Sequence, residues 1–171
     1  MTTSPPVILV TDTSVLVNFL RVDRMDLIRA VSPRFLVTEH AATEITEVYG
    51  EQVARFDAAL AAGCFEICRV EAEAALDLFG HLTATTRLGV GESATIAHAL
   101  AIGAGVAIDD RRARNEALRI SSELSILSTA DLVVLMIREH LLTVGQADKV
   151  KYDWAENHRF RLKISSFADL L

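Results

Sequence analysis

Acidic residues recur in this chain where an apolar run of strand type gives way to a helical pattern. Asp12 follows the β-branched run at residues 7–10, and Asp109 and Asp110 follow a second such run at 106–108. In an open parallel sheet, ligands bind beyond the carboxyl ends of the strands, so these acids would meet at one edge. Like charges brought together are unfavourable unless a cation lies between them. The pattern therefore predicts a carboxylate cluster that binds metal.

Two glutamates extend the acidic set. Glu44 lies beside the apolar stripe of a predicted helix that includes Ala41 and Ile45, and Glu92 lies in the first turn of a nearly uncharged helix predicted at 91–101. Each acid also has a purely structural interpretation. The aspartates could be helix N-caps, Glu44 a solvated flank residue, and Glu92 a favourable partner of the helix dipole.

Clustered carboxylates suit one kind of chemistry. Magnesium and manganese prefer oxygen ligands and usually keep several waters. One or two such ions lower the pKa of a bound water and stabilise the leaving oxygen of a phosphodiester, so no nucleophilic side chain is needed. The sequence shows no Ser/His/Asp set for covalent catalysis. It therefore favours a metal-dependent nuclease.

The elements expected to position these acids alternate between strands and helices. Strands are predicted at residues 7–10, 35–37, 65–68, 106–108 and 124–127. Helices are predicted at residues 15–30, 39–60, 71–86, 91–101, 111–120, 130–142 and 143–157. Charges that alternate with apolar residues also predict a half-buried edge strand at 159–164. This order indicates an α/β fold with a parallel-stranded central sheet flanked by helices.

The composition fits one soluble domain. The chain has 171 residues, 51% of them hydrophobic, and no linker, which predicts a single domain over 1–171. A net charge of −6 argues against binding nucleic acid by bulk charge alone, although an acidic metal site would itself contribute to that value. No apolar run approaches the length of a membrane span, and residues 1–6 lack the basic start of a secretory signal. Two cysteines spaced by four give no disulfide framework, so a cytoplasmic protein is expected.

These motifs resemble the PIN-domain nucleases. Val-Ile-Leu-Val-Thr-Asp-Thr-Ser at 7–14 is similar to the family's strand followed by Asp-x-Ser, and Gly-Glu-Ser-Ala-Thr-Ile-Ala at 91–97 is similar to its third acidic motif. Ala-Ile-Asp-Asp-Arg-Arg-Ala-Arg at 107–114 most resembles a subgroup of small prokaryotic PIN proteins related to the toxins of toxin–antitoxin pairs. The family's second acidic position then falls on Glu44, and the resemblance covers nearly the whole chain.

The resemblance implies a single PIN-like domain that cleaves RNA endonucleolytically, often as a homodimer and often with an antitoxin partner. The implied catalytic acids, which would hold magnesium or manganese, are Asp12, Glu44, Glu92 and one or both of Asp109 and Asp110. Ser14 would support the site by hydrogen bonding. The sequence leaves open which of the two adjacent aspartates is the ligand and which is the helix cap. It departs from the subgroup at 128–129, where Ser-Thr stands in place of the expected Gly-Thr.

Arginines lie beside the acids and allow two interpretations. Arg111, Arg112 and Arg114 could bind RNA phosphates or form a solvated helix face. Arg159 and its alternating neighbours at 161 and 163 could extend a basic rim or protect a sheet edge.

Two other functions compete with the nuclease. A non-catalytic PIN-like module would bind RNA or a protein without cutting, but clustered carboxylates are unfavourable if they bind nothing. A phosphate-handling α/β protein is the other alternative. A haloacid-type phosphatase needs a second Asp two residues after the first, where this chain has Ser14, and the phosphoacceptor Asp and late Lys of a receiver form no convincing pair here.

Overall fold

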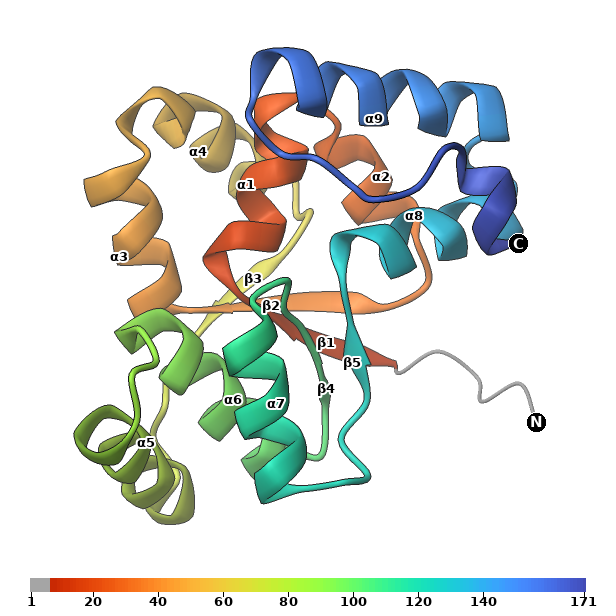
Figure 1. The fold of residues 1–171 in the computed structure, drawn as a ribbon. Coiled ribbons are helices and arrows are strands. Elements are labelled where there is room, and N and C mark those ends of the chain that lie inside the picture. The colour runs from red at the N-terminus through yellow and green to blue at the C-terminus, as the bar shows by residue number, and fades with distance from the viewer. Residues whose placement is uncertain (1–6) are drawn as a thin grey trace.

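A five-stranded, all-parallel sheet runs through the computed structural model, which describes residues 7–171 (Figure 1). Its spatial order is β3-β2-β1-β4-β5. The strands are β1 (Ile8–Thr11), β2 (Arg34–Thr38), β3 (Glu66–Cys68), β4 (Gly105–Ala107) and β5 (Ile126–Leu127). Because the chain builds outward from β1 first to one side and later to the other, β1 and β4 flank the topological switch point where ligands bind in such sheets. The predicted α/β fold with a parallel central sheet is confirmed.

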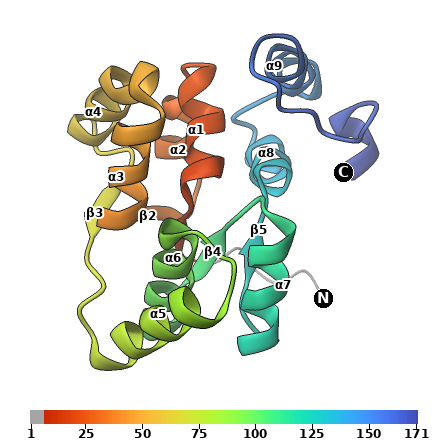
Figure 2. The same ribbon diagram turned by 60° about the vertical axis from the view of Figure 1, so that its left-hand side comes forward.

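Helices cover both faces of this sheet. They are α1 (Thr13–Arg21), α2 (Met25–Ala30), α3 (Glu39–Val48), α4 (Val53–Ala61), α5 (Glu73–Thr85), α6 (Val90–Ile102), α7 (Arg111–Ile120), α8 (Thr129–Arg138) and α9 (Val144–Asn157). Short 3₁₀ turns lie at Gly50–Gln52 and Phe167–Leu170. In both ribbon views, α5, α6 and α7 lie on one side of the sheet and the other helices on the opposite side (Figures 1 and 2). Two separate apolar clusters, one on each face, form the core.

Burial explains the helix that carries Glu92. The predicted apolar helix is α6, and most of its length is buried, including Ala94, Ile96 and Ala99. It packs between the sheet and α5, so its exposed side chains lie at its two ends, at Val90 and at Ala101 and Ile102. The helix also begins next to the core, because Gly91 is buried beside Ala41 and Thr13.

Several predicted boundaries are wrong. The helix predicted at 15–30 is two helices, because the chain turns at Asp23, whose φ of 54° is incompatible with a continuing helix. The helix predicted at 39–60 is likewise divided by the 3₁₀ turn at Gly50–Gln52. The helix predicted at 130–142 ends at Arg138, and the strand predicted at 124–127 is confined to Ile126–Leu127.

The edge strand predicted at 159–164 is also wrong. This segment is irregular, and its alternating residues Phe160, Leu162 and Ile164 pack against the core cluster on the α1–α9 side of the sheet. Its polar backbone groups bond to α9 rather than to a strand: Phe160 N–H donates to the Trp154 carbonyl over 3.1 Å, and Lys151 Nζ donates to the Ile164 carbonyl over 3.3 Å. The alternating pattern correctly indicated which side chains are packed, but it did not indicate that they pack without joining the sheet.

Within residues 7–171, no helix is both long enough and apolar enough to cross a lipid bilayer. The expectation about a secretory signal falls on residues 1–6 and lies outside the described part of the chain.

Candidate active site

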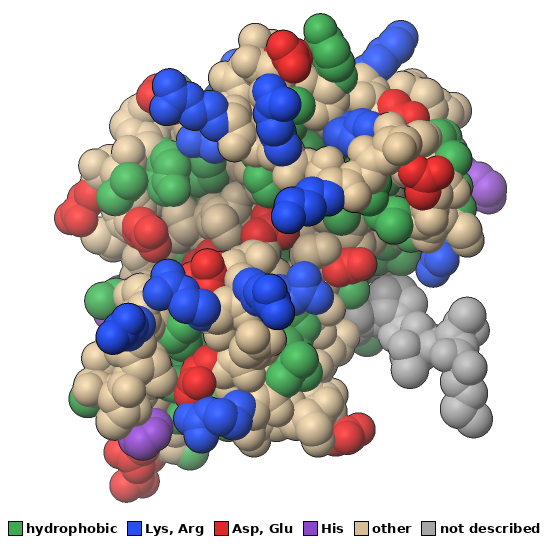
Figure 3. All heavy atoms as spheres, viewed as in Figure 1, with side chains coloured by type: hydrophobic (Ala, Val, Ile, Leu, Met, Phe, Trp, Pro, Cys, Tyr) green, Lys and Arg blue, Asp and Glu red, His purple; other side chains and the backbone are tan. Residues whose placement is uncertain are grey.

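A cavity of about 510 Å³ opens where β1 and β4 end. All five predicted acids and Ser14 line it, namely Asp12, Ser14, Glu44, Glu92, Asp109 and Asp110. Acidic side chains lie in the hollow across the middle of the molecule, with basic side chains on both sides of it (Figure 3). The sheet topology therefore brings together carboxylates that are up to 98 positions apart in the chain (110 − 12).

Asp12 is the most buried of these acids, with 4% of its surface exposed. It caps α1, and its Oδ2 accepts hydrogen bonds from the Ser14 hydroxyl over 2.8 Å and the Ser14 N–H over 3.3 Å. Its Oδ1 is buried and has no hydrogen-bond partner among the described residues. Burial, together with the nearby negative charge of Glu92, raises the Asp12 pKa to about 6. A buried oxygen of this kind favours a bound cation.

Glu44 is held by the turn that follows Asp12. Thr13 Oγ1 donates a hydrogen bond to Glu44 Oε2 over 3.0 Å, which joins the start of α1 to α3. The first turn of α6 passes so close that a Cβ added to Gly91 would lie 2.7 Å from the same Glu44 oxygen. The glycine of the Gly-Glu motif therefore leaves the space that the Glu44 carboxylate occupies.

Glu92 lies between the other acids. One of its oxygens, Oε2, accepts the N–H of Gly89 over 2.8 Å and thereby caps α6. Burial raises the Glu92 pKa, and the negative charges of Asp110 and Glu44 raise it further, against the Gly89 hydrogen bond and the positive charge of Arg112. This place in the first turn agrees with the structural interpretation of Glu92 as a partner of the helix dipole, but the capping hydrogen bond uses only one of its two oxygens.

Asp110 is the helix cap of the adjacent pair. Its Oδ1 accepts hydrogen bonds from the N–H groups of Arg112 over 2.8 Å and Ala113 over 3.0 Å at the start of α7. Its Oδ2 accepts no hydrogen bond from residues 7–171. One carboxylate oxygen of Asp110 therefore stays available beside Glu92.

Asp109 has both oxygens occupied. Oδ1 accepts the Thr129 N–H over 2.8 Å, and Oδ2 accepts the Thr129 hydroxyl over 2.6 Å and the Asn18 amide over 3.1 Å. Asn18 Nδ2 also lies 3.1 Å from Thr129 Oγ1. Burial raises the Asp109 pKa, which the two Thr129 hydrogen bonds oppose. Asp109 therefore binds α1, α8 and the end of β4 to one another.

The basic groups at the cavity agree with the sequence-based expectations only in part, since Arg159 was one of the residues that could extend a basic rim. Arg111, Arg112 and Arg114 do not line it, whereas Arg21 and Arg159 do. Arg21 lies on α1 in helical register with Ser14, Val17 and Asn18, which also line the cavity, and this spacing could have identified it. Two aromatic rings, those of Tyr49 and Phe160, line the cavity together with these two arginines.

Comparison with known proteins identifies the fold. The family model described as "DUF3368: PIN domain" matches residues 8–171. The chain belongs to the PIN-domain family. Among solved structures, this PIN domain is similar to VapBC2 from Rickettsia felis bound to a DNA fragment from their promoter, with a TM-score of 0.51 and 14% sequence identity. The match covers 71% of this chain and 98% of that one. No curated protein sequence matches the chain.

The donor set of this PIN domain fits a hard divalent ion. All the candidate ligands are carboxylates, and Asp12 Oδ1 is buried without a partner among the described residues. Within residues 7–171, no three His, Cys, Asp or Glu side chains converge closely enough to enclose an ion by themselves. Magnesium keeps several waters and is commonly held by only one or two carboxylates, so a partly hydrated ion fits these residues better than an all-protein cage.

Proposed function

We propose that this PIN domain is an endoribonuclease that depends on magnesium or manganese. The observation that carries the proposal is Asp12 Oδ1, which is buried and has no hydrogen-bond partner among residues 7–171, in a cavity lined by four further carboxylates. Membership of a nuclease family supports a hydrolase, and the position of the cavity at the switch point of the sheet supports an active site there.

Each carboxylate has a proposed part. Asp12, Glu44, Glu92 and Asp110 hold the ion directly or through water, since each has an oxygen that can face it. Asp109 is a positioning residue, because its two oxygens are used by Thr129 and Asn18. When bound, the ion lowers the pKa of a water and stabilises the leaving oxygen of the phosphodiester. Ser14 fixes the rotamer of Asp12 so that Oδ1 stays turned to the ion.

The basic and aromatic side chains that line the same cavity support a single-stranded substrate. Guanidinium groups bind phosphate, and aromatic rings stack on unpaired bases whatever their sequence. The Arg21 guanidinium lies 5.6 Å from the centre of the Tyr49 ring and donates to the His158 carbonyl over 3.4 Å. This arrangement holds one phosphate-binding group and one ring beside the acids. The choice of RNA over DNA rests on the resemblance to the small prokaryotic subgroup.

We further propose that the protein is a cytoplasmic toxin, that an antitoxin protein binds it, and that it forms a homodimer. The likeness of its fold to VapBC2 and the resemblance of its motifs to PIN toxins support these points. A competing function is a PIN-like module that binds RNA or protein without cutting.

One cleavage assay separates these functions. Labelled single-stranded RNAs and DNAs are incubated with manganese or magnesium and with wild type or Asp12→Asn. The proposal predicts metal-dependent cutting of RNA that is lost in the variant. Binding of RNA without cutting under every metal condition would instead assign the non-catalytic module.

A further inference from the structure

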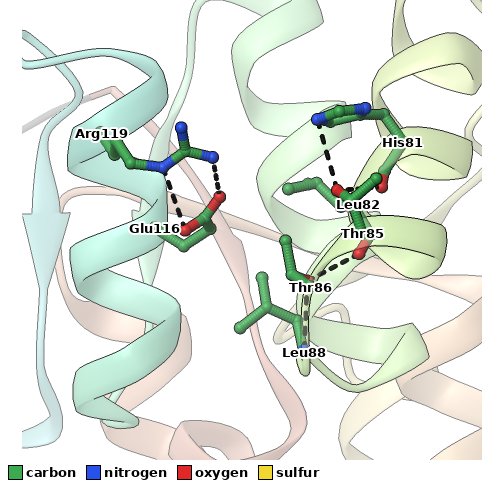
Figure 4. A network of polar contacts seen from close by, with 7 residues as sticks. All are labelled: His81, Leu82, Thr85, Thr86, Leu88, Glu116 and Arg119. Carbon is green, nitrogen blue, oxygen red and sulfur yellow. Dashed lines mark hydrogen bonds and ion pairs between the residues drawn. The ribbon is translucent and has the colours of Figure 1, made fainter.

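A second cavity, of about 500 Å³, lies between α5 and α7 beside the candidate active site. All its lining residues other than Leu88 are charged or polar, namely His81, Thr85, Thr86, Arg87, Arg112, Glu116 and Arg119. Glu116 and Arg119 point from α7 into the space that His81 and Thr85 face from α5 (Figure 4). We call this cavity the basic cleft. It is distinct from the acidic cavity, since the two have no lining residue in common.

The basic cleft continues the acidic cavity along both of its walls. On one wall, Gly89 lines the acidic cavity and the preceding residue, Leu88, lines the basic cleft. On the other wall, Asp110 lines the acidic cavity and Arg112 lines the basic cleft. One or two residues span at most about 7 Å. The positive charge of Arg112 also reaches the acids, because it lowers the pKa of Glu92. A single-stranded RNA that extends from the acids past Gly89 and Asp110 therefore enters the basic cleft.

The cleft has an excess of positive charge in a chain whose net charge is −6. Its single carboxylate, Glu116, is neutralised by Arg119, which donates two hydrogen bonds to it. The Arg87 guanidinium has no hydrogen-bond or ion-pair partner within residues 7–171, and the Arg112 guanidinium makes only a 4.0 Å contact with Asp110 there. Two guanidinium groups are therefore available to an anion.

The arginines, and not the threonine hydroxyls, are the groups of the basic cleft that can donate hydrogen bonds to an anion, because the hydroxyls already donate to helix carbonyls. The hydroxyls of Thr85 and Thr86 donate to the carbonyls of His81 and Leu82, over 2.8 and 2.6 Å. A guanidinium presents a fork of N–H groups that matches phosphate oxygens, and it stays charged at any working pH.

We propose that the basic cleft binds a backbone phosphate of the RNA strand next to the scissile one, through Arg87 and Arg112. This subsite rests on the proposed ribonuclease function. It gives the substrate a direction across the protein, from the wall that carries Arg21 and Tyr49, over the acids, and along α7.

Binding of a single-stranded RNA with a 5′-hydroxyl tests the cleft directly. Fluorescence anisotropy in EDTA, at several salt concentrations, measures affinity without cleavage. Arg87→Gln should weaken binding about fivefold at 0.1 M salt and reduce the slope of log affinity against log salt by about 0.7, the loss of one phosphate contact on a single strand. Glu116→Gln should act in the opposite direction because it releases Arg119. Arg138→Gln, an exposed arginine on α8, changes the net charge equally and serves as the matched control.

Methylphosphonate linkages then locate the contact. When one backbone phosphate at a time is neutralised, the Arg87→Gln effect should vanish at a single linkage, adjacent to the cleavage site. Equal losses in Arg87→Gln and Arg138→Gln, an effect spread evenly over all linkages, or no binding of RNA by wild type would each overturn the subsite. Cleavage and RNA affinity that require Asp12 but do not change in Arg87→Gln would reject the proposed phosphate subsite and leave the proposed nuclease function intact. RNA affinity that depends on Arg87, without cleavage under any metal condition, would support the subsite and reject the nuclease function.

Discussion

Thr129 donates two hydrogen bonds to Asp109, from its N–H over 2.8 Å and from its hydroxyl over 2.6 Å, and so joins the end of β4 to the start of α8. Asn18 adds a third from α1. Three elements that meet at the acidic cavity are thereby held by one carboxylate, while the neighbouring Asp110 keeps one oxygen beside Glu92 that accepts no hydrogen bond from residues 7–171. Adjacent residues of the same type consequently have separable roles.

The asparagine variants of this pair should fail in different ways. Asn is as good a helix N-cap as Asp, so Asp110→Asn should keep its melting temperature but lose at least tenfold in manganese affinity, about 1.4 kcal/mol. Asp109→Asn places an amide donor among the donors of Thr129 and Asn18, which should destabilise the fold by about 1–3 kcal/mol. Thermal melts and calorimetric manganese titrations of both variants check this. Loss of stability in Asp110→Asn alone would reverse the two assignments.

Gly91→Ala should inactivate the protein without unfolding it. The new Cβ would lie 2.7 Å from Glu44 Oε2, the end of a flexible side chain, so the Glu44 carboxylate should move and its hydrogen bond from Thr13 should break. RNA cleavage should fall to the level of Glu44→Gln, and combining the two changes should give little further loss. Gly80→Ala is the control, because open space surrounds Gly80 in α5, and it should stabilise the helix by about 1 kcal/mol. Full activity in Gly91→Ala would show that Glu44 is dispensable.

The stability of the metal-free protein should decrease as the pH rises. The folded-state pKa of Asp12 is raised from 3.8 to about 6, so folding takes up a proton between these values. The associated stability is present below pH 3.8 and is lost as the pH rises through about 6, a total of about 3 kcal/mol. Urea unfolding in EDTA should therefore show wild type losing stability relative to Asp12→Asn across this range, and magnesium should restore it in wild type only. A difference between the two proteins that does not change with pH would contradict the burial of an uncompensated charge.

Arg159 should favour substrate binding through its positive charge but lower the stability of the fold through its backbone conformation. It lines the acidic cavity with a φ of 54°, a conformation that is unfavourable for most residues other than glycine. Arg159→Gly should thus raise the free energy of unfolding by up to about 1 kcal/mol while it weakens RNA binding. Arg159→Asn, which tolerates this backbone and lacks the charge, should weaken binding equally. Unchanged RNA affinity in both variants would place the substrate elsewhere.

The sequence was sufficient for the positions of the strands that carry acids, because buried parallel strands are short, apolar and β-branched, and the aspartates mark their ends. It was not sufficient for the roles of Asp109 and Asp110. Those depend on Asn18, 91 positions away, and on Thr129, 20 positions away. Nor did the alternation at 159–164 show whether its apolar residues meet a strand or a helix. The assignment of catalytic roles to the acids stays a prediction.

Manganese dependence of cleavage, measured together with manganese binding, tests the central proposal most directly. A single-stranded RNA that wild type cuts is incubated over a series of manganese concentrations, and free manganese is followed in the same samples by electron paramagnetic resonance, with Asp12→Asn in parallel. The proposal predicts that cleavage and binding saturate together in wild type, and that both are lost in the variant while it remains folded. Cleavage that is equal in the two proteins, or that is independent of manganese and magnesium, would contradict it.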